Sequence, residues 1–163
     1  MADNILLQKD VKRLFLYQDG NLYWKVKTNP RVNIGAKAGN FNKNNQRTYI
    51  RINKITYGLH RLIFLYHYGW FPTEVDHIDT CRTNNTIENL REATRSQNQH
   101  NKRVQINNTS GVKNVSFVKN RWVVKLKVKR KQIHIGRFKD FELAELVAIM
   151  AREKYHGDFA QHG

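Results

Sequence analysis

The chain has 163 residues and a formal net charge of +16, from 29 Lys and Arg against 13 Asp and Glu. A field of this sign concentrates polyanions, so nucleic acid is the expected partner. The length suits one ordinary domain or two small ones. One cysteine, Cys81, excludes an intramolecular disulfide and a thiolate-rich zinc site. Without an 18-residue apolar run or a signal-peptide core in residues 1–16, we expect an intracellular protein that is not secreted and has no membrane partner.

The first elements predicted along the chain form a small β unit. Residues 14–26 hold two short aromatic runs around Asp19 and Gly20, a pair that strongly favours a hairpin turn. Residues 35–45 are rich in Gly, Asn and Lys, which predicts a loop. Residues 48–55 alternate apolar and polar side chains, which predicts a strand.

Two helices and a linker are predicted next. Residues 60–68, HRLIFLYHY, carry apolar side chains at helical spacing up to Gly69, which predicts a buried helix. Residues 94–102 begin with Thr94, a good N-cap, and end in basic side chains, so a short polar helix is expected. Residues 103–110 lack periodicity and are read as a linker.

The C-terminal part predicts a three-stranded antiparallel sheet covered by one helix. After residue 112, the runs KNVSF, RWVVKLKV and KQIHIGRF alternate with period two between Lys, Asn and Arg turns. Asp140 can cap a helix that extends to about residue 155 and stops at Gly157. The helix stripe expected to pack on the sheet consists of Phe141, Leu143, Ala144, Val147, Ala148, Ala151 and Tyr155.

The same sheet is strongly basic. Residues 93–139 contain thirteen Lys and Arg and no Asp or Glu, a footprint for phosphates. In the central strand, Lys125, Lys127 and Lys129 alternate with apolar residues, so one face is cationic and can enter the major groove. The alternative is that these lysines only block edge pairing and keep the chain soluble.

Residues 75–101 carry the residue types that phosphodiester cleavage requires. Asp76 supplies a hard oxygen ligand for a divalent ion, and His77 supplies an imidazole that titrates near neutrality. For both side chains to reach one phosphate, the strand must be irregular there. Asn98 can offer a second oxygen ligand, and Asn89 can orient His77.

Neighbouring residues leave alternatives open. Asn84, Asn85 and Asn101 could be mistaken for the two functional asparagines. His60 is expected to be a hydrogen-bonded core histidine and Asp79 to shape a turn, although either could contribute to the site. His100 is expected to face away from Asn98 on the helix. Four arginines near the site are candidates for phosphate binding: Arg61, Arg82, Arg91 and Arg95.

The motifs DHID, NN, ENLREAT and SQNQHN resemble the core of the HNH nuclease family, in the variant with Asn in place of the final His. The upstream motifs LYWKV, AGNF, YIRI and GLHRLIFLYHYGWFP are similar to the phage and intron-borne members. The resemblance implies a ββα-metal fold with His77 as general base, Asn89 as the central orienting residue, and Asp76 with Asn98 as ligands of one divalent ion.

The segment 110–160 resembles the plant ethylene-response-factor DNA-binding domain, of the Apetala-two type. The plant domains use Arg and Trp at several groove-reading positions where this chain has Lys, Ser and His, so sequence preference does not transfer. By position, the groove-reading residues fall on Lys113, Ser116, Lys125, Lys127, Gln132 and His134.

Together these features predict an α+β fold with an HNH nuclease domain (1–102), a linker (103–110) and an Apetala-two-like DNA-binding domain (111–163). The predicted function is a metal-dependent, homing-type endonuclease of phage type that cuts double-stranded DNA in the cytoplasm of a bacterial host, as a monomer or homodimer. Mg²⁺ is the expected cofactor, with Mn²⁺ and Zn²⁺ as alternatives. The rival functions are a catalytically inactive DNA-binding regulator and an RNA-binding protein.

Overall fold

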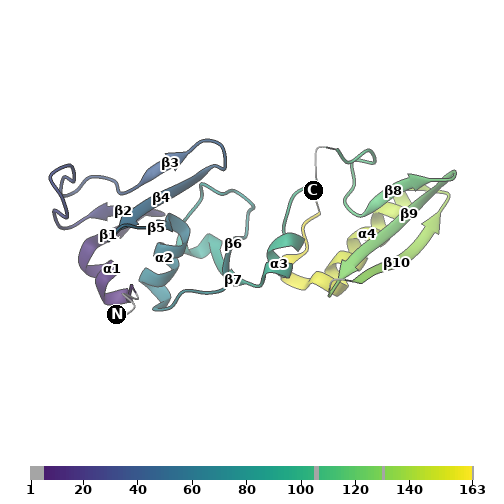
Figure 1. The fold of residues 1–163 in the computed structure, drawn as a ribbon. Coiled ribbons are helices and arrows are strands. Elements are labelled where there is room, and N and C mark those ends of the chain that lie inside the picture. The colour runs from purple at the N-terminus through teal and green to yellow at the C-terminus, as the bar shows by residue number, and fades with distance from the viewer. Residues whose placement is uncertain (1–5, 105–106, 130, 163) are drawn as a thin grey trace. The chain divides into compact units, whose positions relative to one another are not determined.

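The computed structural model describes residues 6–104, 107–129 and 131–162. The chain divides into two compact units, Met1–Ala93 and Thr94–Gly163. Both mix helices with small antiparallel sheets, so the α+β class is confirmed (Figure 1). The predicted first domain extends to residue 102, whereas the boundary between the units lies after Ala93. Helix α3 (Arg95–His100) belongs to the second unit and contacts the 3₁₀ turn η2 (Gly157–Phe159) there. None of the helices among the described residues has the length and apolar character that a bilayer crossing requires.

The first unit begins with helix α1 (Gln8–Leu14), which the sequence analysis missed, and the hairpin of β1 (Phe15–Gln18) and β2 (Asn21–Trp24). The turn residues Asp19 and Gly20 have φ values of 46° and 72°. Two successive positive φ values match the twist of a two-residue hairpin. The predicted hairpin is confirmed.

A second small sheet follows, formed by β3 (Asn40–Asn42), β4 (Arg47–Ile52) and β5 (Ile55–Gly58). The single strand predicted over residues 48–55 is wrong at its end. Asn53 and Lys54 have φ values of 48° and 69°, so the chain reverses there and β5 pairs back onto β4. The alternation of polar and apolar residues already breaks at this point, because two polar residues stand between Ile52 and Ile55.

The predicted buried helix is confirmed as α2 (Leu59–Tyr68), which ends at Gly69 in the left-handed conformation. Its apolar face forms the centre of the first core, with Leu62 and Ile63 fully buried. This helix packs against β2, β4 and β5 and against β6 (Glu74–His77), which pairs with β7 (Leu90–Ala93). The core therefore fixes the strands that carry Asp76 and His77.

The second unit starts with the predicted polar helix, α3 (Arg95–His100), whose N-cap Thr94 accepts a hydrogen bond from the Gln97 backbone. The predicted three-stranded sheet with a covering helix is also confirmed, in the strand order β10-β9-β8. Its elements are β8 (Val115–Val118), β9 (Arg121–Val128), β10 (Lys131–Phe138), α4 (Phe141–His156) and η2 (Gly157–Phe159).

The face of α4 that packs on the sheet differs from the predicted stripe. Ala144 and Ala148 are fully buried, whereas Leu143 is 48% exposed and Tyr155 is 42% exposed. Small alanines let the helix approach the sheet closely, and this rotation turns Leu143 outward. The Arg152 side chain is fully buried, which the apolar pattern of the helix did not predict.

Candidate functional site

Asp76 and His77 are the last two residues of β6 (Glu74–His77), which pairs with β7 (Leu90–Ala93). Both side chains are buried, with 4% and 5% of their surface exposed. Strand pairing stays regular through His77, so the expected irregularity is not within the pair. It lies directly after it, where the Thr80 backbone N–H donates to the His77 carbonyl at 2.9 Å and Thr80 has a φ of 63°.

Asp76 forms a buried ion pair across the hairpin. Arg91 lies opposite it in the register, and its Nη2 and Nε atoms lie 2.8 and 2.9 Å from Asp76 Oδ2. A buried carboxylate requires such a partner because desolvation of an unpaired charge is costly. Arg91 was predicted to bind DNA, and its guanidinium here binds the candidate metal ligand instead.

The His77 imidazole is oriented by Asn85. Its Nε2 atom donates to Asn85 Oδ1 at 3.0 Å, and both side chains are buried. With the proton on Nε2, the ring lone pair lies on Nδ1, the form that a general base needs. Sequence reasoning missed Asn85 as the orienting residue. The signal was the Asn84–Asn85 pair, in which motif spacing could not separate one residue from the other.

Burial lowers the pKa of His77, and the nearby Arg47 guanidinium lowers it further, while Asn85, Asp79 and Asp76 oppose the change. His60, from α2, lies beside it with 5.5 Å between ring centroids. Burial first, and then the charge of Arg47, lowers the pKa of His60 to about 3. Arg47 Nη1 donates to His60 Nε2 at 2.8 Å, which matches the expected hydrogen-bonded core histidine. Both imidazoles are therefore neutral at pH 7.

Asn89 closes the loop that follows β6. Its Oδ1 accepts from the Asp79 backbone at 3.0 Å, and its Nδ2 donates to Asp79 Oδ1 at 2.9 Å and to the Asn84 carbonyl at 2.8 Å. Burial alone would raise the pKa of Asp79, but hydrogen bonds from Asn84, Cys81 and Asn89 lower it below its ordinary value. Asp79 shapes this turn, as expected. Asn89 holds Asn84, the residue before Asn85.

The N-terminal hairpin supports the same loop. A Cβ atom added to Gly20 would lie 2.8 Å from the Thr86 backbone nitrogen, so only glycine permits this close approach. The Tyr17 hydroxyl accepts a hydrogen bond from the Ile87 backbone at 3.1 Å. The turn of the first hairpin therefore helps to place Asn85 against His77.

The remaining predicted residues lie in different settings. Arg61 donates to the carbonyls of Thr73 and Pro72 at 3.2 and 2.9 Å, so it ties α2 to the segment before β6. Asn98 is half-buried on α3, in the second unit. Arg95 is exposed on the same helix.

The predicted metal ligands are one carboxylate and one amide, from Asp76 and Asn98. Hard oxygen donors suit Mg²⁺, which usually keeps several waters and needs one or two carboxylates from the protein. Groups of three or more His, Cys, Asp or Glu side chains that could hold a metal do not occur among the described residues. A carboxylate and an amide oxygen are donors that suit a hydrated Mg²⁺ rather than a zinc ion enclosed by histidines and cysteines.

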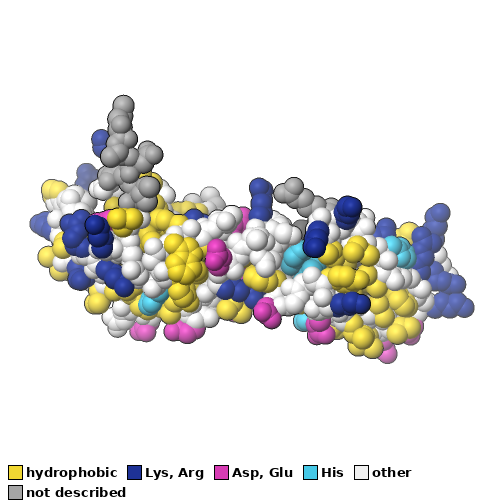
Figure 2. All heavy atoms as spheres, turned by 90° about the horizontal axis from the view of Figure 1, so that it is seen from below, with side chains coloured by type: hydrophobic (Ala, Val, Ile, Leu, Met, Phe, Trp, Pro, Cys, Tyr) yellow, Lys and Arg dark blue, Asp and Glu magenta, His cyan; other side chains and the backbone are white. Residues whose placement is uncertain are grey.

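The outer face of the β8–β10 sheet gathers most of the predicted DNA-binding side chains. Lys127 lies opposite Gln132 and Lys125 opposite His134, and all four are exposed. Ser116 on β8 is exposed as well. Lysine and arginine side chains form clusters on the surface of this unit (Figure 2).

Lys113 differs from this group. Its ammonium donates to the backbone carbonyls of His100 and Lys102 at 2.6 and 2.5 Å. Burial, and then the charge of Arg152, lowers its pKa to about 8. Lys113 therefore holds the segment after α3. It lies before β8 in the chain and does not form part of the exposed sheet face.

A model of the HNH endonuclease family matches residues 57–100, which run from the end of β5 through α3. The chain is also similar to Protein 3.8 of Escherichia phage T7, with 35% identity over 91 residues that cover 53% of this chain and 73% of that protein. The chain belongs to the HNH endonuclease family. The HNH segment contains Asp76, His77, Asn85, Asn89 and Asn98. No solved structure matches the chain.

Proposed function

We propose that this HNH protein is a metal-dependent endonuclease that hydrolyses phosphodiester bonds in double-stranded DNA. The observation that carries the proposal is the His77 imidazole, which follows Asp76 in the chain and is buried in its neutral form, held by Asn85. A neutral, oriented imidazole can take the proton of an attacking water. The net charge of +16 favours association with the polyanionic substrate.

In this proposal, His77 accepts the proton through Nδ1 while Asn85 fixes the ring through Nε2. Asn89 is a positioning residue that acts through the loop rather than on the reacting atoms. Asp76 and Asn98 would hold the divalent ion, Mg²⁺ in the first instance. When bound, such an ion stabilises negative charge on the phosphate and the leaving oxygen.

We infer that the second unit supplies DNA recognition in the manner of an Apetala-two domain, with the outer sheet face in the major groove. Lys125, Lys127, Gln132 and His134 support this because they are exposed on adjacent strands. Together with the phage relative, this organisation favours a homing-type nuclease that acts inside a bacterial host. A monomer would nick one strand, and a symmetric dimer would cut both.

The alternative is a DNA-binding regulator that does not cleave. One contact favours it, because the Arg91 guanidinium binds the Asp76 oxygen that a metal ion would also use. Cleavage requires a metal ion to compete with this ion pair. A regulator would keep the pair intact and would bind DNA equally well with and without Mg²⁺.

The test is relaxation of supercoiled plasmid that carries a fragment of the host genome, in Mg²⁺ and in EDTA. Wild type and His77→Ala are compared, with DNA binding measured in parallel. Cleavage that needs the metal and is lost in His77→Ala, while binding persists, is the expected result. Binding without cleavage in Mg²⁺, Mn²⁺ and Zn²⁺ would contradict the nuclease and support the regulator.

A further inference from the structure

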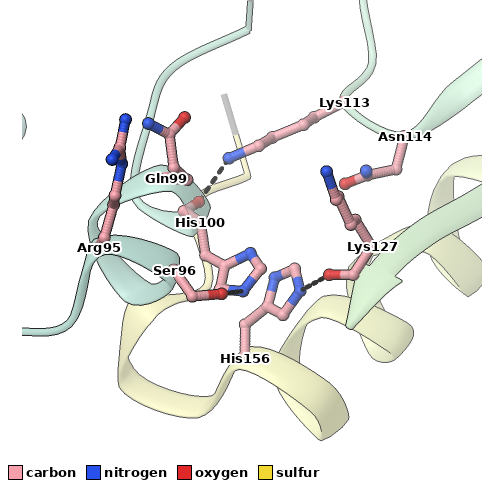
Figure 3. A pocket seen from close by; sticks show the side chains of 8 residues that line it. All are labelled: Arg95, Ser96, Gln99, His100, Lys113, Asn114, Lys127 and His156. Carbon is pink, nitrogen blue, oxygen red and sulfur yellow. Dashed lines mark hydrogen bonds between the residues drawn. The ribbon is translucent and has the colours of Figure 1, made fainter. Parts of the chain in front are cut away.

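The second unit contains a cavity of about 520 Å³ that the proposed nuclease site does not use. It lies between α3 and the part of β9 beyond Val124, the residue that pairs with Val115 at the start of β8. Eight residues line it (Figure 3): Arg95, Ser96, Gln99, His100, Lys113, Asn114, Lys127 and His156. They come from α3, from the segment before β8, from β9 and from the end of α4.

The charge of the cavity wall is entirely positive. Among the described residues that line it, Arg95, Lys113 and Lys127 are cations and none is Asp or Glu. Figure 3 shows the Lys113 and Lys127 side chains extending toward the space above the two imidazoles. Behind them, the buried Arg152 guanidinium donates to the Lys113 carbonyl. Several cations close together repel one another, and an anion between them would relieve that repulsion.

Two stacked imidazoles form the base of the cavity. The rings of His100 and His156 lie 3.6 Å apart between centroids, with 20° between their planes. His156 Nε2 donates to the Lys127 carbonyl at 3.2 Å, and Ser96 Oγ lies 3.2 Å from His100 Nε2. Among the described residues, the Nδ1 atom of His156 is buried without a hydrogen-bond partner. On protonation, this nitrogen becomes a donor for an anion.

Both imidazoles are neutral in the present arrangement. Burial, then the neighbouring His156, then Lys113 lowers the pKa of His100 to about 4. Burial, then Lys113 and Arg152, lowers the pKa of His156, while its bond to the Lys127 carbonyl opposes the change. The charged side chains that line the cavity beside this pair are Lys113, Lys127 and Arg95. A bound anion would oppose their effect and raise the pKa of His156.

We propose that this cavity binds a phosphate group, and that in the complex this group is a backbone phosphate of the DNA on the outer sheet face. The DNA part of this statement rests on the proposed function. Lys127 links the two surfaces, since it belongs to the exposed sheet face opposite Gln132 and also lines the cavity. DNA on that face would have its backbone near the cavity.

Such a phosphate would also hold α3 against the sheet of its own unit. Arg95, Ser96, Gln99 and His100 of this short helix line the cavity, and Asn98 lies on the same helix. A ligand that contacts both α3 and Lys127 would fix the helix that carries a predicted metal ligand. Phosphate binding here would thus couple recognition of DNA to the order of the nuclease segment.

The test follows the imidazole proton resonances of His156 by NMR, in EDTA so that no cleavage occurs. Chloride is replaced by inorganic phosphate at constant ionic strength. We expect phosphate to raise the pKa of His156 by about one pH unit, the lower end of what a neighbouring opposite charge produces. Lys127→Gln should remove this response, and Lys125→Gln, which lies on the sheet face but not in the cavity, should retain it. Equal titrations in chloride and phosphate would overturn the proposal.

A short DNA duplex, added in place of phosphate, identifies the source of the group. Movement of the His156 resonances by the duplex supports the backbone phosphate. A response to inorganic phosphate without a response to bound duplex would overturn the DNA assignment and leave a site for free phosphate or a nucleotide. Because the readout needs neither metal nor cleavage, failure of the nuclease proposal would not change it.

Discussion

The β6–β7 site and the outer face of the β8–β10 sheet use charged and polar residues in opposite ways. At the first, Asp76 and His77 are buried, and each has a defined hydrogen-bonding partner. At the second, Lys125 and Lys127 are exposed on neighbouring positions of one face. Burial fixes protonation and orientation, as chemistry requires, whereas exposure provides long-range attraction. The comparison therefore predicts that changes at the first surface act on rate and changes at the second act on affinity.

The largest expected effect is that of His77→Ala on cleavage. Loss of a general base lowers the rate by about 10²- to 10⁴-fold. DNA affinity should change little, because His77 is 5% exposed and offers no surface to the groove. Single-turnover cleavage and equilibrium binding, measured on the same duplex, check both statements. A comparable loss of affinity would break the distinction between the two surfaces.

Asn85→Ala should lower the cleavage rate by about 10- to 100-fold, the usual cost of removing a group that orients a functional side chain. The pH profile gives a readout that a merely structural defect would not. Asn85 raises the pKa of His77, so its removal should move the acid limb of the rate profile to lower pH. Asn33→Ala, at an exposed asparagine between β2 and β3, is the matched control and should leave the profile unchanged. An unshifted acid limb in Asn85→Ala would contradict the orienting role.

The sheet face should respond in affinity and in salt dependence. Log affinity falls as log salt rises, and each phosphate contact that is removed reduces the magnitude of this slope by about 0.9. For Lys125→Gln combined with Lys127→Gln, we expect weaker binding and a slope whose magnitude is reduced by nearly two. Lys27→Gln combined with Lys43→Gln, both exposed in the first unit, is the control of equal charge. Equal slopes in the double variant and the wild type would contradict DNA binding by this face.

The last expected effect is on stability at acid pH, through His60. Its pKa is about 3 when folded against an ordinary value of 6.5, so the unfolded chain binds a proton first as the pH falls. Stability contributed by neutral His60 is therefore present above pH 6.5 and declines between pH 6.5 and about 3, by at most about 1.4 kcal/mol per pH unit. Urea unfolding of wild type and His60→Gln checks this. His134→Gln, at an exposed position, should keep the wild-type dependence of the free energy of unfolding on pH. The same dependence in His60→Gln would refute the assignment to His60.

Local sequence signals determined a large part of this fold. The Asp19–Gly20 hairpin, α2 with its Gly69 stop, α3 with its Thr94 cap and the C-terminal sheet with α4 were all predictable. Each depends on residues close together in the chain, namely turn residues, caps and apolar periodicity. The same signals failed at Asn53 and Lys54, where polar residues can either continue a strand or adopt a left-handed turn.

The sequence also determined which segment carries the chemistry, because Asp76, His77 and the asparagines lie within one run of the chain. Tertiary structure decided which asparagine contacts His77 and which arginine pairs with Asp76. It also brought His100 onto His156 from 56 positions away to form the base of a cavity. These pairings depend on the register of strands and the rotation of helices. Both are set by packing of the whole core, so a local pattern cannot specify them.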